Sequence, residues 1–168
     1  MGIFDRLFKR EEPLPELNVS DSDIVAMTDG TIVDIKTVPD PMFAEELLGK
    51  SIAFRFDKDK VMICSPANGE LSALYPTGHA FGVTTNEGVD LLVHIGVDTV
   101  NAKGDGFRLM GKKCGDRVKA GEPIVEADVR KLSQNYDMST MLIITNPNGK
   151  DLTFIEPQNV VRGQSVLK

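Results

Sequence analysis

The sequence predicts an all-β protein, an antiparallel β-sandwich of barrel-like outline with one or a few short helices. Short apolar stretches of alternating pattern recur along the chain. Turn signals rich in Gly, Asn and Pro separate them at 29–30, 65–69, 86–88 and 146–149. Such regular spacing is typical of a sandwich. The 168 residues, of which 41% are hydrophobic and 26% charged, are enough for one globular domain with a sizeable core.

The first part of the chain differs in composition from the rest. Residues 1–18 are expected to form a flexible amphipathic tail and linker, and residues 19–168 a single domain. If residues 1–10 form a helix, its apolar and basic side chains separate onto two sides, as in segments that lie on an anionic membrane surface. A helix of about ten residues is marginal in water, so a frayed tail stays equally open.

Charge and cysteine content restrict the class of partner. The net charge of −6 disfavours nucleic acid as a partner. No apolar run approaches the roughly 18 residues of a membrane span, and no signal peptide is visible. Cys64 and Cys114 lack metal-ligand spacing, which indicates reduced thiols. We therefore expect a cytoplasmic protein, which is peripheral at the inner face of the cell membrane if its tail binds lipid.

One helix is expected among the strands. Asp40 followed by Pro41 is typical of a helix N-cap and its first position. Residues 44–48 are mostly good helix formers, and Gly49 suits the position just after a helix. Phe43 and Leu47 would then share one face, because they stand four residues apart.

The most apolar stretch, residues 91–100, predicts a strand that carries one of only two histidines. His94 falls on the face opposite the core, beside Gly96. If residues 85–88 form a four-residue hairpin loop, His79 on the preceding strand pairs with His94 across the ladder, with Cβ atoms about 4.5–5.5 Å apart. A three-residue loop over 86–88 would shift the register by one residue and part the rings. The residues expected to face the core are Leu91, Val93, Ile95 and Val97.

An opposed pair of histidines supports three interpretations. A neutral imidazole can accept a phosphoryl group as a nucleophile while the second ring donates to the phosphoryl oxygens, and Thr77 could orient His79. Alternatively, His79 and His94 could bind zinc together with a carboxylate such as Asp98. The pair could also be packed in the sheet without a function. The chemistry favours phosphoryl transfer, and with it the paired register.

The histidine motifs resemble those of a known family. Residues 77–81 (Thr-Gly-His-Ala-Phe) and 94–100 (His-Ile-Gly-Val-Asp-Thr-Val) strongly resemble the glucose-type enzyme IIA component of the phosphoenolpyruvate-dependent sugar phosphotransferase system. The similarity covers about residues 24–168 in the family's order. It includes Val38–Ala44, Ser65-Pro66 with Gly69, Gly104–Phe107 and Gly115–Gly121.

The resemblance implies an antiparallel β-sandwich that carries phosphate and needs no cofactor. His94 would accept phosphate from the histidine phosphocarrier protein and pass it to a cysteine on the enzyme IIB domain of a separate sugar permease. His79 would contact the phosphoryl group, and Thr77 would hydrogen-bond to His79. Partners would dock on an apolar depression with an acidic rim. The matching residues are Phe43, Tyr75, Leu92 and Val97, with Asp40 and Asp98 on the rim.

Two other functions compete with phosphate carriage. One is a regulatory binding module, in which phosphate on His94 adds charge to an apolar contact face and disfavours docking there. The other is a zinc hydrolase on a related sandwich, which needs a His-x-His pair that the sequence lacks. Lys50 stands where the family usually has an acid, a difference that bears on the choice of partner or permease.

Overall fold

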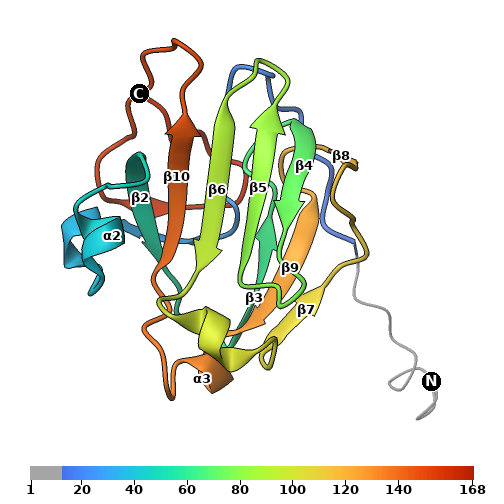
Figure 1. The fold of residues 1–168 in the computed structure, drawn as a ribbon. Coiled ribbons are helices and arrows are strands. Elements are labelled where there is room, and N and C mark those ends of the chain that lie inside the picture. Colours follow the sequence, from blue (N-terminus) through green and yellow to red (C-terminus); the bar gives the residue numbers. More distant parts are fainter. Residues whose placement is uncertain (1–12) are drawn as a thin grey trace.

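A computed structural model describes residues 13–168 as two antiparallel sheets, with short helices in the connections between strands (Figure 1). The larger sheet has eight strands and the smaller has three. Strands β2, β10, β6, β5 and β4 run side by side in the larger sheet (Figure 1). The amphipathic segment 1–10 lies outside the described residues.

In sheet order, the larger sheet is β11 (Asn159–Val160), β1 (Gly30–Val33), β2 (Lys50–Arg55), β10 (Thr140–Asn146), β6 (Asp90–Ile95), β5 (Ala80–Thr85), β4 (Gly69–Leu74) and β8 (Arg117–Val118). The smaller is β3 (Lys60–Cys64), β9 (Pro123–Asp128) and β7 (Phe107–Leu109).

Side chains from both sheets pack into one core, which makes the fold a sandwich. Phe54, Phe81 and Val93 of the larger sheet and Ile63 and Val125 of the smaller belong to the same buried cluster. The predicted antiparallel sandwich is therefore confirmed. Over residues 13–168 the sheets do not close into a barrel. The short helices are η1 (Ile35–Thr37), α2 (Pro41–Ala44), η2 (Thr99–Ala102) and α3 (Val129–Leu132).

A second, smaller apolar cluster covers the other face of the larger sheet. Strand β10 shows why two clusters form, because its side chains alternate between the faces. Leu142 lies in the main core, whereas Met141 and Ile143 join the second cluster. Ile35 of η1 and Phe43 of α2 cover that second cluster. The centre of the sheet is thus buried on both sides, and the second cluster covers the face of the sheet on which His94 lies.

The register of β5 against β6 differs from the prediction by one residue. Ala80 pairs with His94, so the predicted pairing of His79 with His94 is wrong. The reason lies in the turn. Thr85 donates its N–H to the carbonyl of Val89 (2.8 Å) and accepts from the N–H of Gly88 (2.9 Å), which leaves a three-residue loop over 86–88. Gly88 has φ +82°, the left-handed conformation that such a loop requires.

Helix α2 is shorter than predicted. Its N-cap is the expected one, because Asp40 Oδ1 accepts from the N–H of Met42 at 2.9 Å. The helix nevertheless ends at Ala44, and Glu46 takes φ +54°. The Glu46 side chain accepts from the N–H of Ser51 at 2.9 Å, which ties the turn to the start of β2. Leu47 is consequently 68% exposed and does not share the buried face of Phe43.

The predicted linker runs along the surface of the domain from residue 13. The Arg162 guanidinium donates to the carbonyl of Pro15 (2.9 Å) and to that of Gly121 (2.6 Å). The proposed boundary at residues 18 and 19 stays a prediction. Within residues 13–168, no helix has both the length and the apolar character needed to cross a membrane.

Candidate functional site

His94 stands near the end of β6, on the face that carries the second apolar cluster. Its Nδ1 atom lies 2.7 Å from the carbonyl oxygen of Gly96. Because a carbonyl can only accept, Nδ1 carries a proton, and the neutral ring has its lone pair on Nε2. Gly96 has φ +78°, which lets its carbonyl turn back toward the ring that precedes it by two residues. The local backbone thus leaves the outer nitrogen free to act as a nucleophile.

His79 reaches His94 although the two residues are not a ladder pair. Strand β5 begins at Ala80, so His79 lies just outside the ladder, where only its carbonyl accepts from the N–H of Ile95 (2.7 Å). Gly78 before it has φ +78°, which turns the chain away from the strand direction. The two ring centroids lie 5.5 Å apart with their planes at 73°. The predicted meeting of the rings is confirmed, and the expectation that the shifted register would part them is wrong.

Two neighbours hold the His79 ring. Thr77 Oγ1 lies 2.7 Å from His79 Nδ1. Tyr75 stacks on the same ring, with centroids 5.0 Å apart and an angle of 5° between the planes. When the Thr77 hydroxyl donates, Nδ1 is the acceptor, and the proton of the neutral ring sits on Nε2. Nε2 of His79 is then a hydrogen-bond donor, whereas Nε2 of His94 carries a free lone pair.

Burial keeps both imidazoles neutral. Burial lowers the pKa of His79 below its ordinary value. For His94, burial is the strongest of several effects and lowers the pKa. The nearby His79 lowers the pKa of His94 further, whereas the Gly96 carbonyl, Asp40 and Asp98 raise it. An unperturbed histidine titrates at about 6.5, so a lowered pKa leaves the neutral, nucleophilic form dominant at neutral pH.

The four apolar residues of the predicted docking surface divide into two pairs. Phe43 is buried and packs its ring on His94, with centroids 4.9 Å apart, and Tyr75, stacked on His79, is 48% exposed. Leu92 and Val97 do not stack on a histidine ring, but they pack in the second cluster, to which Phe43 also belongs. The prediction that Val97 faces the main core with Leu91 is wrong, because β6 ends at Ile95 and the chain changes direction at Gly96.

The two acids predicted for the rim stand close to His94. Asp40 is half-buried and uses one carboxylate oxygen as the cap of α2. Asp98 is exposed, takes φ +58° at the start of η2 and makes no capping hydrogen bond with its side chain. Against the stronger effect of burial, which lowers the pKa of His94, the charges of both acids raise it. Both carboxylates thus act on the imidazole through space.

The sequence did not reveal the supports of the two rings. The role of the Gly96 carbonyl depends on a backbone conformation, and the stacking of Tyr75 on His79 depends on where the chain leaves β5. The glycines at 78 and 96 beside the two histidines were the available signal. In the structure both adopt positive φ.

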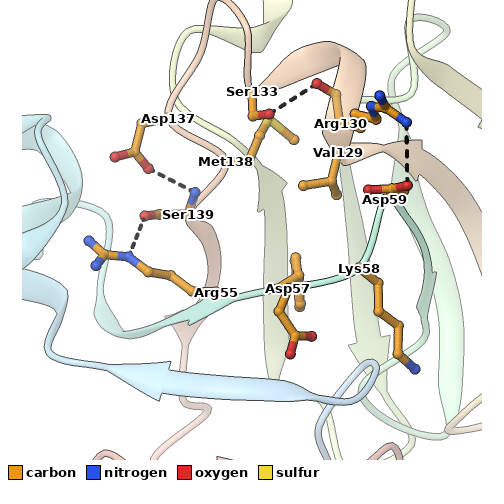
Figure 2. Close-up of a pocket in the computed structure, with 11 residues that line it drawn as sticks. Arg55, Asp57, Lys58, Asp59, Val129, Arg130, Ser133, Asp137, Met138 and Ser139 are labelled. Atoms are coloured by element: carbon orange, nitrogen blue, oxygen red, sulfur yellow. Dashed lines mark hydrogen bonds and ion pairs between the residues drawn. The ribbon is translucent and has the colours of Figure 1, made fainter.

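A surface cleft of about 420 Å³ lies between the end of β2 and α3 (Figure 2). Its lining has charges of both signs, including Arg55, Asp59, Arg130 and Asp137, and it contains neither histidine. The histidine pair is therefore not part of this cleft.

A metal centre is not assembled by the described part of the chain. Within residues 13–168, no group of three His, Cys, Asp or Glu side chains is arranged to hold a metal ion. Asp98 follows His94 at His-x-x-x-Asp spacing, but its carboxylate does not complete a three-ligand set with the two imidazoles. The histidines on their own offer two nitrogen ligands.

Comparison with known proteins identifies the family. A family model described as "phosphoenolpyruvate-dependent sugar phosphotransferase system, EIIA 1" matches residues 22–149. The chain belongs to this family. It is therefore a phosphoryl-carrier component of a sugar phosphotransferase system, and the resemblance seen in the sequence is confirmed.

Individual relatives agree with this assignment. The glucose-specific EIIA component of Haemophilus influenzae is 36% identical over 169 residues, which cover 99% of this chain and 97% of that protein. The glucose-specific EIICBA component of Staphylococcus carnosus is 31% identical over 145 residues, 86% of this chain but 21% of that longer protein. The solved glucose permease IIA of Mycoplasma capricolum is 33% identical with a TM-score of 0.79, covering 86% of this chain and 93% of that one.

Proposed function

We propose that His94 carries the phosphoryl group of this EIIA protein on its Nε2 atom. The observation that supports the proposal is the 2.7 Å hydrogen bond from Nδ1 to the Gly96 carbonyl, which leaves the lone pair on Nε2. The phosphoryl donor is a phosphohistidine of the histidine phosphocarrier protein. A bond forms between His94 Nε2 and phosphorus as the bond to the donor nitrogen breaks. In the second step a cysteine thiolate of an enzyme IIB domain attacks phosphorus as the bond from phosphorus to Nε2 breaks, and His94 leaves as neutral imidazole because Nδ1 has kept its proton.

His79 assists both transfers from the side. With Thr77 donating to Nδ1, the Nε2–H of His79 can donate to a phosphoryl oxygen, where negative charge has to be stabilised. The ring separation of 5.5 Å leaves both outer nitrogens within reach of one phosphoryl group. Thr77 and the stacked Tyr75 fix the orientation of this donor, so that little reorganisation is needed during transfer.

Both protein partners dock on the face that carries the rings. Of the four apolar residues, Tyr75 (48% exposed) and the partly exposed Leu92 supply contact area, whereas Phe43 and Val97 are buried and support this face from within. Asp40 and Asp98 lie next to His94 and favour partners with basic groups around their own reactive residue. The Staphylococcus carnosus relative is named as an EIICBA component, so its A part is joined to B and C parts in one chain. The B partner that we propose for our chain is an enzyme IIB domain of the same kind.

Substitution of each histidine tests this proposal. His94→Gln is expected to take no phosphate from the phosphorylated phosphocarrier protein, because glutamine lacks a nucleophilic nitrogen. His79→Gln should still be labelled but should pass phosphate to enzyme IIB slowly. The measurement is acid-labile phosphate on His94, by radiolabel and mass spectrometry. Cys114→Ser, at an exposed thiol away from the rings, is the control. Normal labelling of His94→Gln would refute the mechanism.

A second function has support from the surface near the rings. Met42, Leu47 and Leu48, in and after α2, are 41%, 68% and 38% exposed. These apolar groups lie in the same short segment as Phe43, which packs on His94. A phosphoryl group on His94 adds negative charge at that contact face and disfavours docking of an apolar partner. The carrier can thus also be a regulatory binding module, which pull-downs with phosphorylated and unphosphorylated protein would separate from carriage alone.

Family membership also favours a cytoplasmic protein, in reach of a permease at the membrane. Contact of residues 1–10 with the inner face of the membrane stays a prediction, since this segment lies outside the described residues.

A further inference from the structure

We propose that Asp137 is a positioning residue for phosphoryl transfer, which sets the proton position on His94 through the Gly96–Val97 peptide group. The inference rests on the proposed role of His94. Asp137 lies in the segment between α3 and β10, 43 positions away from His94 in the sequence, on the rim of the cleft in Figure 2. It touches neither ring, and its influence passes through backbone hydrogen bonds.

The Asp137 side chain shapes a tight turn. Its Oδ1 accepts from the backbone N–H of Ser139 at 2.8 Å, a bond drawn in Figure 2. Ser139 is 2% exposed and Met138 9%, so the turn is packed against the domain although Asp137 itself is exposed. A side-chain oxygen that accepts from the N–H two residues on replaces a backbone turn bond and fixes the direction of the intervening carbonyls.

Both carbonyls of this turn hold the backbone beside His94. The Asp137 carbonyl accepts from the N–H of Val97 at 2.8 Å, and the Ser139 carbonyl accepts from the N–H of Gly96 at 3.1 Å. Met138 closes the remaining space, because a Cβ added to Gly96 would come 2.8 Å from its sulfur. The turn therefore fixes Gly96 by two hydrogen bonds and by packing.

The decisive link is one planar peptide group. The N–H of Val97 and the C=O of Gly96 belong to the same peptide, so fixing one fixes the direction of the other. The Val97 N–H points to Asp137, and the Gly96 C=O points to His94 Nδ1, 2.7 Å away. Hydrogen bonds in such a chain polarise one another, which makes the Gly96 carbonyl a stronger acceptor. The result is a proton held on Nδ1 and a more basic Nε2.

Substitutions at Asp137 separate this role from a general effect on folding. Asp137→Ala removes the acceptor of the Ser139 N–H, whereas Asp137→Asn keeps an oxygen in its place. Asp137→Glu keeps the charge but moves the acceptor by one methylene, and it serves as a second variant if the alanine variant unfolds. Asp59→Ala is the matched control, because Asp59 is an acid of the same cleft whose side chain pairs with Arg130.

Two measurements on the full chain decide the question. Nitrogen-15 NMR of the unphosphorylated protein reports which ring nitrogen of His94 carries the proton, and the His79 ring reports that the fold is intact. Rapid-quench kinetics with phosphorylated phosphocarrier protein report the rate of phosphate acceptance. For Asp137→Ala we expect a mixture of His94 tautomers and an acceptance rate about tenfold lower, which corresponds to the loss of about one hydrogen bond (about 1.4 kcal/mol) from the transfer step. The donor concentration at half saturation should not change.

Asp137→Glu should fall between the alanine variant and the native protein, and Asp137→Asn and Asp59→Ala should match the native protein. The proposal is overturned if Asp137→Ala and Asp137→Glu keep the native tautomer and rate, or if Asp137→Asn is as impaired as Asp137→Ala. If the proposed function itself is wrong, the native protein will carry no phosphate on His94, which is a different outcome from those above. In that case the tautomer comparison still decides what Asp137 does.

Discussion

Replacing Thr77 by valine tests how the second histidine works. Valine has nearly the shape of threonine but lacks the hydroxyl that lies 2.7 Å from His79 Nδ1. The Tyr75 stack stays in place, so the ring keeps its packing and loses only its hydrogen-bond partner. The neutral ring is then free to move its proton to Nδ1, which removes the donor from Nε2.

The size of the effect follows from the burial of the ring. His79 is 7% exposed, so little water is available to replace the lost partner. Removing a partner from a buried polar group costs about 1–3 kcal/mol, against about 0.5–1.5 kcal/mol for a typical net hydrogen bond. If about 1.4 kcal/mol of this falls on the transfer step, the rate drops about tenfold. We therefore expect donation to enzyme IIB to slow about tenfold, with a smaller change in acceptance.

The assay is single-turnover transfer from phosphorylated protein to an enzyme IIB domain, followed by rapid quench. Thr77→Ser keeps the hydroxyl and is the matched control, which should transfer at nearly the native rate. Nitrogen-15 NMR of His79 should show a rise in the Nδ1–H tautomer in the valine variant alone. Native transfer rates in Thr77→Val, with the tautomer changed, would show that the proton position on His79 does not matter for the chemistry.

Two further predictions concern titration and thiol reactivity. Burial lowers the pKa of both imidazoles in the folded protein, so their contribution to stability is complete above about pH 6.5 and declines as the pH falls toward the folded-state pKa values. The urea midpoint of the native protein should therefore fall between pH 7 and 5.5 by more than that of a double His→Gln variant. An equal fall of the two midpoints would contradict this. Burial, opposed by Arg162, raises the pKa of the Cys64 thiol to about 11, whereas Cys114 is exposed, so an aromatic disulfide reagent at pH 8 should label Cys114 alone in the folded protein and both thiols after denaturation.

The sequence predicted the parts of the fold that depend on local patterns. Alternating apolar residues and Gly-rich turns indicate strands wherever the neighbours are, and Asp40 caps α2 as its position before Pro41 indicates. The length of α2 could not be predicted in this way, because it ends where Glu46 reaches the backbone of Ser51 in the next strand. The register of β5 and β6 depends on hydrogen bonds at Thr85 that two different turns could have made.

The candidate site shows the same division. The histidines and Thr77 were recognisable from residue types and spacing, and the structure brings all three together. What holds them is long-range: Phe43 comes to His94 from another part of the chain, and the turn at Asp137 bonds to Val97 across 40 residues of sequence. Such contacts leave no periodic trace in a single sequence, because they depend on how the two apolar clusters pack.

The position of both rings on one outer face of the larger sheet also sets the order of events in the proposed cycle. A donor and an acceptor that both need Nε2 of His94 have to approach from the same side of the ring, because Phe43 of the second cluster packs against His94. The two partners therefore exclude each other, and the carrier works by alternate encounters without a three-protein complex. Uptake of sugar then depends on how quickly each spent partner leaves, so tighter docking to either one would slow the relay as a whole.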